Sequence, residues 1–194
     1  MNYLNWTFRN LANLVTGIRL AMCIVIAFLG FFCSSRMDII FWWALVAILT
    51  DPIDGIIARK LGIISSFGAK FDRFTDKMLE FVMFAIILAS PHVVFWLKLA
   101  VWPMVIVEAL LLGTIYFGVR HREMDVSAGW WGKAKMILVS VAIMVSTLMI
   151  AVIQRSICVP DFLQTVIAIT FLISFALGIM SLRGHMHQWL DQAF

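Results

Sequence analysis

The sequence predicts an all-α membrane protein, and three observations carry that prediction. Hydrophobic residues make up 63% of the 194 residues, whereas charged residues make up 13%, against about 25% in soluble globular chains. The mean hydropathy is +0.99. The apolar residues also fall into runs of about 20, the length of helix that crosses a bilayer core. This composition excludes a disordered tail, a disulfide-rich secreted module and a nucleic-acid-binding domain, none of which keeps so much apolar surface out of water.

Polar boundaries divide the chain into one surface segment and six transmembrane spans, which we expect to form a single membrane domain over residues 1–194. Residues 1–12 mix aromatic side chains with Asn5 and Arg9, as is typical of an amphipathic helix in the membrane interface. Each later run is apolar and long enough to cross a bilayer. The predicted spans are residues 13–33, 39–60, 66–90, 93–120, 132–153 and 162–182.

The basic residues predict the orientation of these spans. An even number of spans places both termini on one side of the membrane, and every Lys and Arg except Arg36, Lys98 and Arg155 falls on that side. Basic residues favour the cytoplasmic side. We therefore expect both termini and the turn near residues 60–66 to face the cytoplasm, in a bacterial inner membrane.

Four carboxylates lie in segments that we expect to cross the membrane. An ionised side chain there costs at least about 2.5–3.5 kcal/mol, so these acids need compensation. Asp51 and Asp54 are three residues apart, and Asp72 and Asp76 are four apart, which places each pair on one helix face. The short turn with Gly62, Ser65 and Ser66 predicts an antiparallel hairpin, in which the two acidic faces should meet.

A cluster of four carboxylates favours a hard divalent cation. Without cations the carboxylates would repel one another, and the absence of nearby Cys or His argues for Mg²⁺ or Mn²⁺. Two ions about 3.5–4 Å apart could clamp a pyrophosphate. Gly55, Ala58 and Gly68 would leave room for a substrate against the backbone, and Arg59 could hold phosphate oxygens.

The spacing of these residues resembles the complete signature of the CDP-alcohol phosphotransferase family. Every fixed position and gap is matched by Asp51-x2-Asp54-Gly55-x2-Ala58-Arg59-x8-Gly68-x3-Asp72-x3-Asp76. The resemblance extends to the chain length and to the six spans. It implies a homodimeric, metal-dependent membrane enzyme in which an alcohol attacks a CDP-linked donor and CMP leaves.

The resemblance also implies roles for individual residues. Asp51, Asp54, Asp72 and Asp76 would ligate the metal ions, and Asp76 would also deprotonate the attacking hydroxyl. Arg59 would contact the donor diphosphate. The donor site would further include Gly55, Ala58, Gly68, Asn13 and Thr16. These roles agree with the chemistry of phosphoryl transfer, in which positioning and charge neutralisation dominate.

Two further motifs indicate the substrates. Asn13-x2-Thr16-x2-Arg19 and Gly132-Lys133-Ala134-Lys135 resemble patterns of the phosphatidylglycerophosphate synthases within the family. That resemblance implies CDP-diacylglycerol as donor and glycerol 3-phosphate as acceptor. A predicted basic collar at the cytoplasmic mouth would bind the acceptor phosphate, and it consists of Arg120, Arg122, Lys133 and Lys135.

Other acceptors remain open at this point. Arg73, Val107, Met136 and Val139 depart from the synthase pattern, which leaves cardiolipin synthesis from phosphatidylglycerol, or an inositol phosphate acceptor, as alternatives. A cation or proton transporter is an alternative from another class, because intramembrane carboxylates also line ion pathways. It does not explain the glycines and Arg59 at fixed offsets.

Several charged residues also have a purely structural interpretation. A single acid such as Asp72 could pair with Arg59 or Arg73, and the basic collar could simply flank cytoplasmic helix ends. Glu80 could support the acidic face or form a salt bridge within its helix. Glu108 likewise has both a functional and a structural interpretation.

Overall fold

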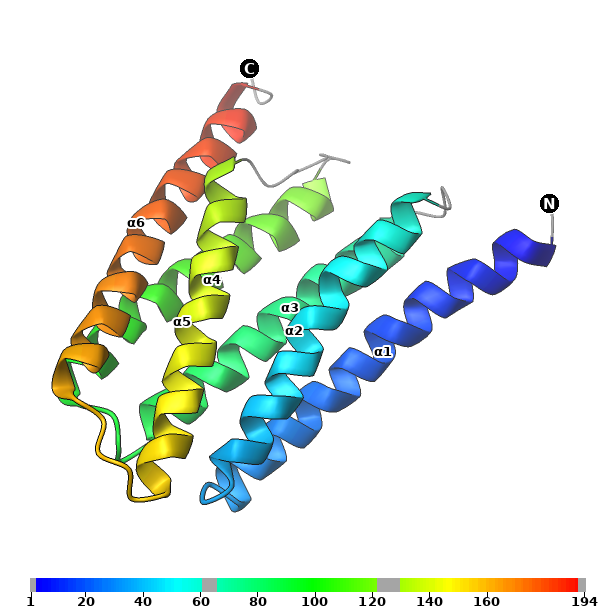
Figure 1. Ribbon diagram of the computed structural model, residues 1–194. Helices are drawn as coiled ribbons and strands as arrows, with labels where there is room; N and C mark the ends of the chain where they lie inside the picture. The colour runs from blue at the N-terminus through cyan, green and yellow to red at the C-terminus, as the bar shows by residue number, and fades with distance from the viewer. Residues whose placement is uncertain (1–2, 61–65, 122–129, 192–194) are drawn as a thin grey trace. The chain divides into compact units, whose positions relative to one another are not determined.

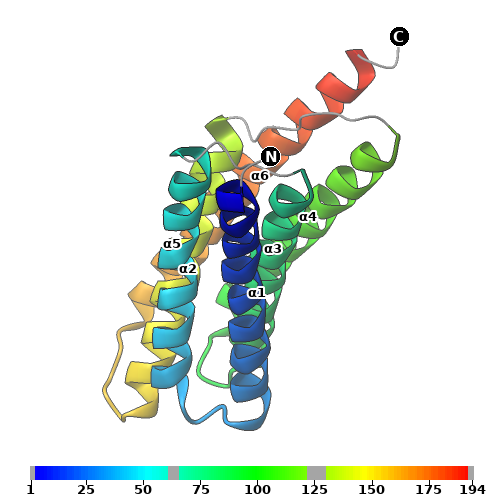
Figure 2. The ribbon, with the colours of Figure 1, turned by 90° about the vertical axis from the view of Figure 1, so that its right-hand side faces the viewer.

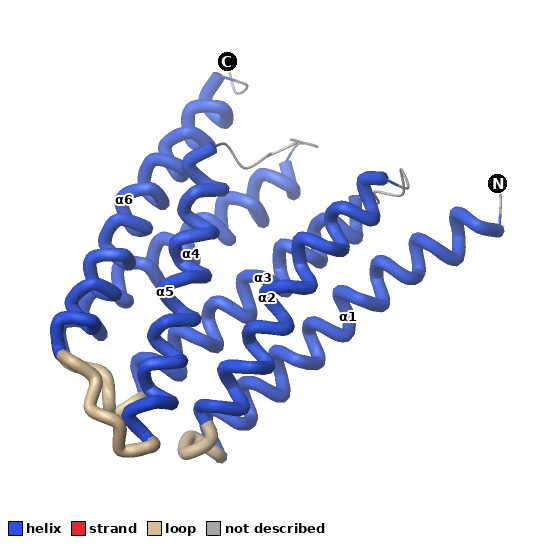
Figure 3. The backbone as a smooth tube through the Cα atoms, viewed as in Figure 1, coloured by secondary structure: helices blue, strands red, loops and turns tan. Residues whose placement is uncertain are grey.

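The described backbone contains six α-helices and short turns. The computed structural model describes the backbone of residues 3–60, 66–121 and 130–191, and the side chains of residues 16–50, 71–113 and 130–184. Within these ranges all regular structure is helical, as predicted (Figure 1, Figure 3). The helices are α1 (Tyr3–Phe32), α2 (Met37–Lys60), α3 (Ser66–Ala89), α4 (Phe95–His121), α5 (Trp130–Gln154) and α6 (Asp161–Asp191).

The four middle helices begin and end within two residues of the predicted spans, whereas α1 and α6 are longer. α1 starts at Tyr3 and continues without a break through the predicted interfacial segment, so a separate amphipathic helix is not confirmed. α6 continues to Asp191, beyond the predicted end at residue 182. The difference arises because hydropathy marks the apolar length of a segment, while a helix continues as far as its backbone hydrogen bonds do.

Among residues 16–50, 71–113 and 130–184, three helical segments are long and apolar enough to cross a membrane, namely Phe95–Gly113, Trp130–Gln154 and Asp161–Gly184. Thr16–Phe32 and Met37–Thr50 are shorter apolar segments of the described chain. Many large apolar side chains on these helices, including Trp102, Ile137 and Phe162, are exposed in the monomer, as they would be in lipid. The chain is therefore a membrane protein, and the number of six spans stays a prediction.

The chain divides into two compact units, residues 1–86 and 87–194, which are described separately. In the first unit α1 packs against α2 (Figure 2). Two backbone hydrogen bonds close the turn between them, from Cys33 N–H to the Leu29 carbonyl at 2.8 Å and from Arg36 N–H to the Cys33 carbonyl at 2.9 Å. The short turn makes α1 and α2 antiparallel.

α1 also contacts α3, and the two helices run in the same direction. Arg19 of α1 reaches Asp72 and Asp76, and the Cα of Gly30, 11 residues later in α1, lies against the Ile86 side chain. Eleven helical residues span about 16 Å. This length is close to that of the stretch of α3 from Asp76 to Ile86, the residues that these two positions of α1 contact. A Cβ at Gly30 would collide with Ile86, so glycine permits this close approach.

In the second unit α6 packs against both α4 and α5. The Val94 N–H donates a hydrogen bond of 2.9 Å to the Gln164 side-chain oxygen, which fixes the start of α4 against α6. Phe171 of α6 is fully buried. The buried hydroxyls of Ser146 and Thr147 donate to carbonyls one turn earlier at 2.7 and 2.8 Å, so these polar groups are satisfied inside an apolar core.

The contact between Gly30 and Ile86 predicts a position-specific effect on stability. We expect Gly30→Leu to lower the apparent Tm in detergent, because overpacking costs about 1–3 kcal/mol and each kcal/mol shifts Tm by about 2–4 °C in a chain of this size. Gly17→Leu on the same helix is the matched control, since nothing lies within 4 Å of its added Cβ. Equal melting temperatures for the two variants would contradict the close approach.

Candidate functional site

The candidate site consists of Arg19 on α1 and two carboxylates on α3. Nη1 of Arg19 lies 2.8 Å from Oδ1 of Asp72 and 3.0 Å from Oδ1 of Asp76. The Arg19 side chain is 1% exposed, whereas those of Asp72 and Asp76 are 41% and 19% exposed. The guanidinium is thus enclosed by protein, while both carboxylates can be reached from outside.

The helical repeat explains why these groups meet. Asp72 and Asp76 are separated by four residues in α3, which places their side chains one above the other on one face. Thr16 and Arg19 are separated by three residues in α1, and both are buried. The predicted clustering of Asp72 and Asp76 on one face therefore agrees with the structure.

The charges of this cluster do not cancel. One guanidinium faces two carboxylates, so with both acids ionised the three groups carry a net charge of −1. A buried guanidinium without partners would be very costly, and removing one member of a buried ion pair typically costs about 3–5 kcal/mol. Within this triad the two carboxylates therefore outnumber the guanidinium that holds them.

The donor set of Asp72 and Asp76 fits a hard divalent cation. Carboxylate oxygens are the ligands preferred by Mg²⁺ and Mn²⁺, and both side chains are accessible. Among the side chains that the structure describes, no group of three or more His, Cys, Asp or Glu residues forms a metal cluster. Asp51 and Asp54 lie outside that set, so the four-carboxylate centre stays a prediction.

The other predicted site residues are described only in part. Asp51, Asp54, Gly55, Ala58 and Arg59 lie on the last three turns of α2, and Gly68 lies in the first turn of α3. Their side chains are outside the described set, as are those of Asn13, Arg120 and Arg122. Thr16 is buried on the same helix as Arg19, and its role in donor binding stays a prediction.

Arg19 had no assigned role in the sequence interpretation beyond its place in a motif. The structural alternative paired Asp72 with Arg59 or Arg73. The structure places Arg19, 53 residues away, beside Asp72, and the side chain of Arg59 lies outside the described residues. A signal was present in the sequence, because Arg19 is itself a charge within an apolar run and needs a partner there. Sequence spacing could not identify which acids supply it.

Glu80, one turn beyond Asp76, forms a salt bridge within α3. Its Oε2 accepts a hydrogen bond of 2.7 Å from Nζ of Lys77, and both side chains are largely buried. The interpretation of Glu80 as a partner in a helix-interior salt bridge is confirmed.

A second buried ion pair joins α4 to α5. Nζ of Lys135 lies 2.5 Å from Oε1 of Glu108, and the two side chains are 3% and 0% exposed. Gly178 of α6 lies beside this pair, and an added Cβ there would meet Val107 and the Lys135 side chain. Lys133 is exposed, in contrast to Lys135. Acceptor binding by Lys135 stays a prediction, but its ammonium group already has a carboxylate partner.

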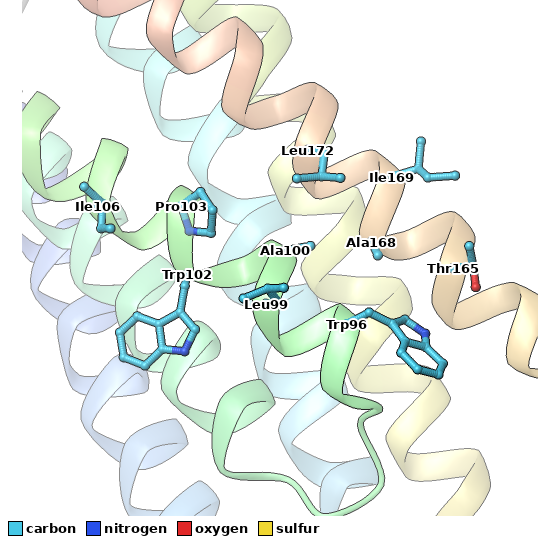
Figure 4. Close-up of a pocket in the computed structure, with 10 residues that line it drawn as sticks. All are labelled: Trp96, Leu99, Ala100, Trp102, Pro103, Ile106, Thr165, Ala168, Ile169 and Leu172. Atoms are coloured by element: carbon cyan, nitrogen blue, oxygen red, sulfur yellow. The ribbon is translucent and has the colours of Figure 1, made fainter.

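An apolar pocket of about 680 Å³ lies between α4 and α6 (Figure 4). Ala100 and Ala168 are small, while Trp96, Trp102 and Leu172 are among the larger lining residues. No residue that lines the pocket carries an ionisable side chain. It is therefore unsuited to phosphoryl chemistry, and the carboxylate cluster remains the candidate site.

The sequence is similar to one protein family and to several curated proteins. The sequence profile described as CDP-alcohol phosphatidyltransferase matches residues 9–180. A "Probable phosphatidylglycerophosphate synthase" of two Mycobacterium tuberculosis strains is 30% identical over 139 residues, covering 69% of this chain and 64% of the relative. A "CDP-diacylglycerol--glycerol-3-phosphate 3-phosphatidyltransferase" of Rickettsia felis is 36% identical over 76 residues, covering 37% of this chain and 40% of the relative.

This chain thus spans less than two thirds of the length of these curated relatives. No solved structure matches it significantly.

The ion pair between Glu108 and Lys135 predicts a non-additive effect on stability. We expect Glu108→Gln to lower Tm by about 6 °C or more, because an unpaired buried charge costs about 3–5 kcal/mol and each kcal/mol shifts Tm by about 2–4 °C. Adding Lys135→Met should restore most of the loss. Arg36→Gln, which removes the exposed member of the pair with Asp38 at 3.5 Å, is the control and should change Tm little. A double variant no more stable than Glu108→Gln would refute the coupling.

Proposed function

Because the chain belongs to the CDP-alcohol phosphatidyltransferase family, we propose that it transfers a phosphatidyl group from CDP-diacylglycerol to glycerol 3-phosphate. The products are phosphatidylglycerol phosphate and CMP, so the reaction is a step of phospholipid biosynthesis. The family match over residues 9–180, which include all four signature acids, is the observation that carries the proposal. It also argues against a cation or proton transporter.

The names of the curated relatives support this acceptor. The Rickettsia relative is named for glycerol 3-phosphate and the Mycobacterium relative for phosphatidylglycerophosphate synthesis. Neither name supports cardiolipin synthesis or an inositol phosphate acceptor. The departures at Arg73, Val107, Met136 and Val139 are therefore better explained as variation among enzymes that use glycerol 3-phosphate.

The proposed reaction is a displacement at phosphorus. A hydroxyl oxygen of glycerol 3-phosphate forms a bond to the phosphorus that carries the diacylglycerol, and the bond from that phosphorus to the CMP oxygen breaks. The hydroxyl proton goes to the carboxylate of Asp76. Asp76 is suited to this role because its side chain is partly exposed and because Arg19 holds one of its oxygens.

Mg²⁺ or Mn²⁺, with two ions per site, is the proposed cofactor. The ligands would be the four signature carboxylates, Asp51, Asp54, Asp72 and Asp76. When bound, the ions would neutralise the negative charge of the donor diphosphate. The accessible oxygen donors of Asp72 and Asp76 support this assignment.

The remaining roles follow from the family signature. In the proposed donor site Arg59 holds diphosphate oxygens, and the nucleotide lies against Gly55, Ala58 and Gly68, near Asn13 and Thr16. The acceptor phosphate binds the collar of Arg120, Arg122, Lys133 and Lys135. Exposure of Lys133 supports direct contact with the acceptor, whereas Lys135 would have to share its charge with Glu108.

The proposed setting is a bacterial inner membrane, with both termini and the active site facing the cytoplasm. The distribution of Lys and Arg supports this orientation, which gives the site direct access to water-soluble glycerol 3-phosphate. Membrane lipids surround the protein, and we propose that it acts as a homodimer.

Release of CMP tests the acceptor. Purified protein incubated with CDP-diacylglycerol and Mn²⁺ should release CMP with glycerol 3-phosphate but not with phosphatidylglycerol or inositol phosphate. Asp76→Asn is the matched control and should lower kcat by at least about 100-fold, the usual minimum contribution of a general base. Release with phosphatidylglycerol alone would replace the proposed acceptor, and full turnover by Asp76→Asn would remove its role as base.

Removal of divalent cations tests the cofactor. Treatment with EDTA should abolish CMP release, and added Mg²⁺ or Mn²⁺ should restore it, because four clustered carboxylates need cationic neutralisation to bind an anionic donor. Zn²⁺ and Ca²⁺ serve as comparison ions in the same titration. Unchanged turnover after exhaustive chelation would refute the metal requirement.

A further inference from the structure

Arg19 holds two carboxylates of the candidate site with one nitrogen atom. Both Oδ1 atoms, on Asp72 and Asp76, lie within 3.0 Å of Nη1. We propose that Arg19 is a positioning residue, which keeps these two carboxylates side by side so that a divalent cation meets an ordered pair of ligands. The inference rests on the proposed function for the identity of the ligands and extends it to a residue on another helix.

Burial makes Arg19 a rigid anchor. Its side chain is 1% exposed, so the guanidinium cannot exchange its carboxylate partners for water. The carboxylates are the more exposed members of the cluster, and two like charges on one helix face repel each other. A buried cation that holds one oxygen of each acid opposes this repulsion and restrains both side chains at once.

Geometry also limits what a substitute could do. A guanidinium is a planar group with five donors in fixed directions, whereas an ammonium is a compact charge on a flexible stem. Lysine at position 19 would keep the positive charge, but the shorter side chain would hold the two Oδ1 atoms less firmly. Glutamine would lose the charge as well. The two variants therefore separate charge from geometry.

The sign of the effect on cation affinity distinguishes positioning from simple electrostatics. If Arg19 acted only as a nearby positive charge, removing it would tighten divalent cation binding, because like charges repel. If it positions the ligands, removing it weakens binding, as loss of outer partners of metal ligands does by about 10–100-fold.

The test is a Mn²⁺ titration of the purified 194-residue protein in detergent, with free Mn²⁺ measured by electron paramagnetic resonance. We expect Arg19→Gln to raise the Kd for Mn²⁺ at least about tenfold, and Arg19→Lys to give a value between those of the parent and Arg19→Gln. Arg36→Gln is the matched control, because Arg36 is an exposed arginine that pairs with Asp38 at 3.5 Å; its Kd should equal that of the parent. An unchanged or lower Kd for Arg19→Gln overturns the inference, as does a parent protein that binds no Mn²⁺.

A second measurement separates positioning from a general loss of structure. At saturating Mn²⁺, Arg19→Gln should lower kcat for CMP release while the KM for the donor changes little, and Arg19→Lys should recover part of kcat. If Arg19→Gln does not fold, Arg19→Lys decides alone: a Kd raised threefold or more supports the inference, and a smaller change overturns it. The titration needs no turnover, so a parent that binds Mn²⁺ but releases no CMP argues against the proposed function and leaves the test of Arg19 intact.

Discussion

The described structure depends on the compensation of charge in an apolar environment. A charged side chain at the centre of a membrane span costs about 2.5–3.5 kcal/mol even on the mildest scales, and this chain buries Arg19, Glu108 and Lys135 almost completely. Each is within hydrogen-bond distance of an opposite charge on another helix. Ion pairs therefore join α1 to α3 in the first unit and α4 to α5 in the second.

The sequence was sufficient to predict the helices but not all of their ends. Polar residues interrupt the apolar runs between the four middle spans, so α2 to α5 are predicted within two residues. α1 and α6 extend past their apolar runs, and hydropathy contains no information about such extensions. The pairing of Asp72 with Asp76 on one face follows directly from the helical repeat.

The pairing of these acids with Arg19 could not be predicted from spacing. Arg73 is the sequence neighbour of Asp72, but adjacent residues point in different directions on a helix. Arg19 is 53 residues away from Asp72, and only the packing of α1 beside α3 brings the two together. The same holds for Lys135, which sequence places in a solvated basic collar and which the structure buries against Glu108 because α4 and α5 approach there.

The ion pair between α4 and α5 also bears on how the chain enters a bilayer during synthesis. α4 emerges from the ribosome with a lone carboxylate, and the ammonium group that neutralises it follows only 27 residues later. Either helix alone would carry an isolated charge into hydrocarbon, whereas the two together carry a neutral pair. Cotranslational insertion is therefore most favourable when both segments leave the translocon as one helical hairpin, already joined by their opposite charges.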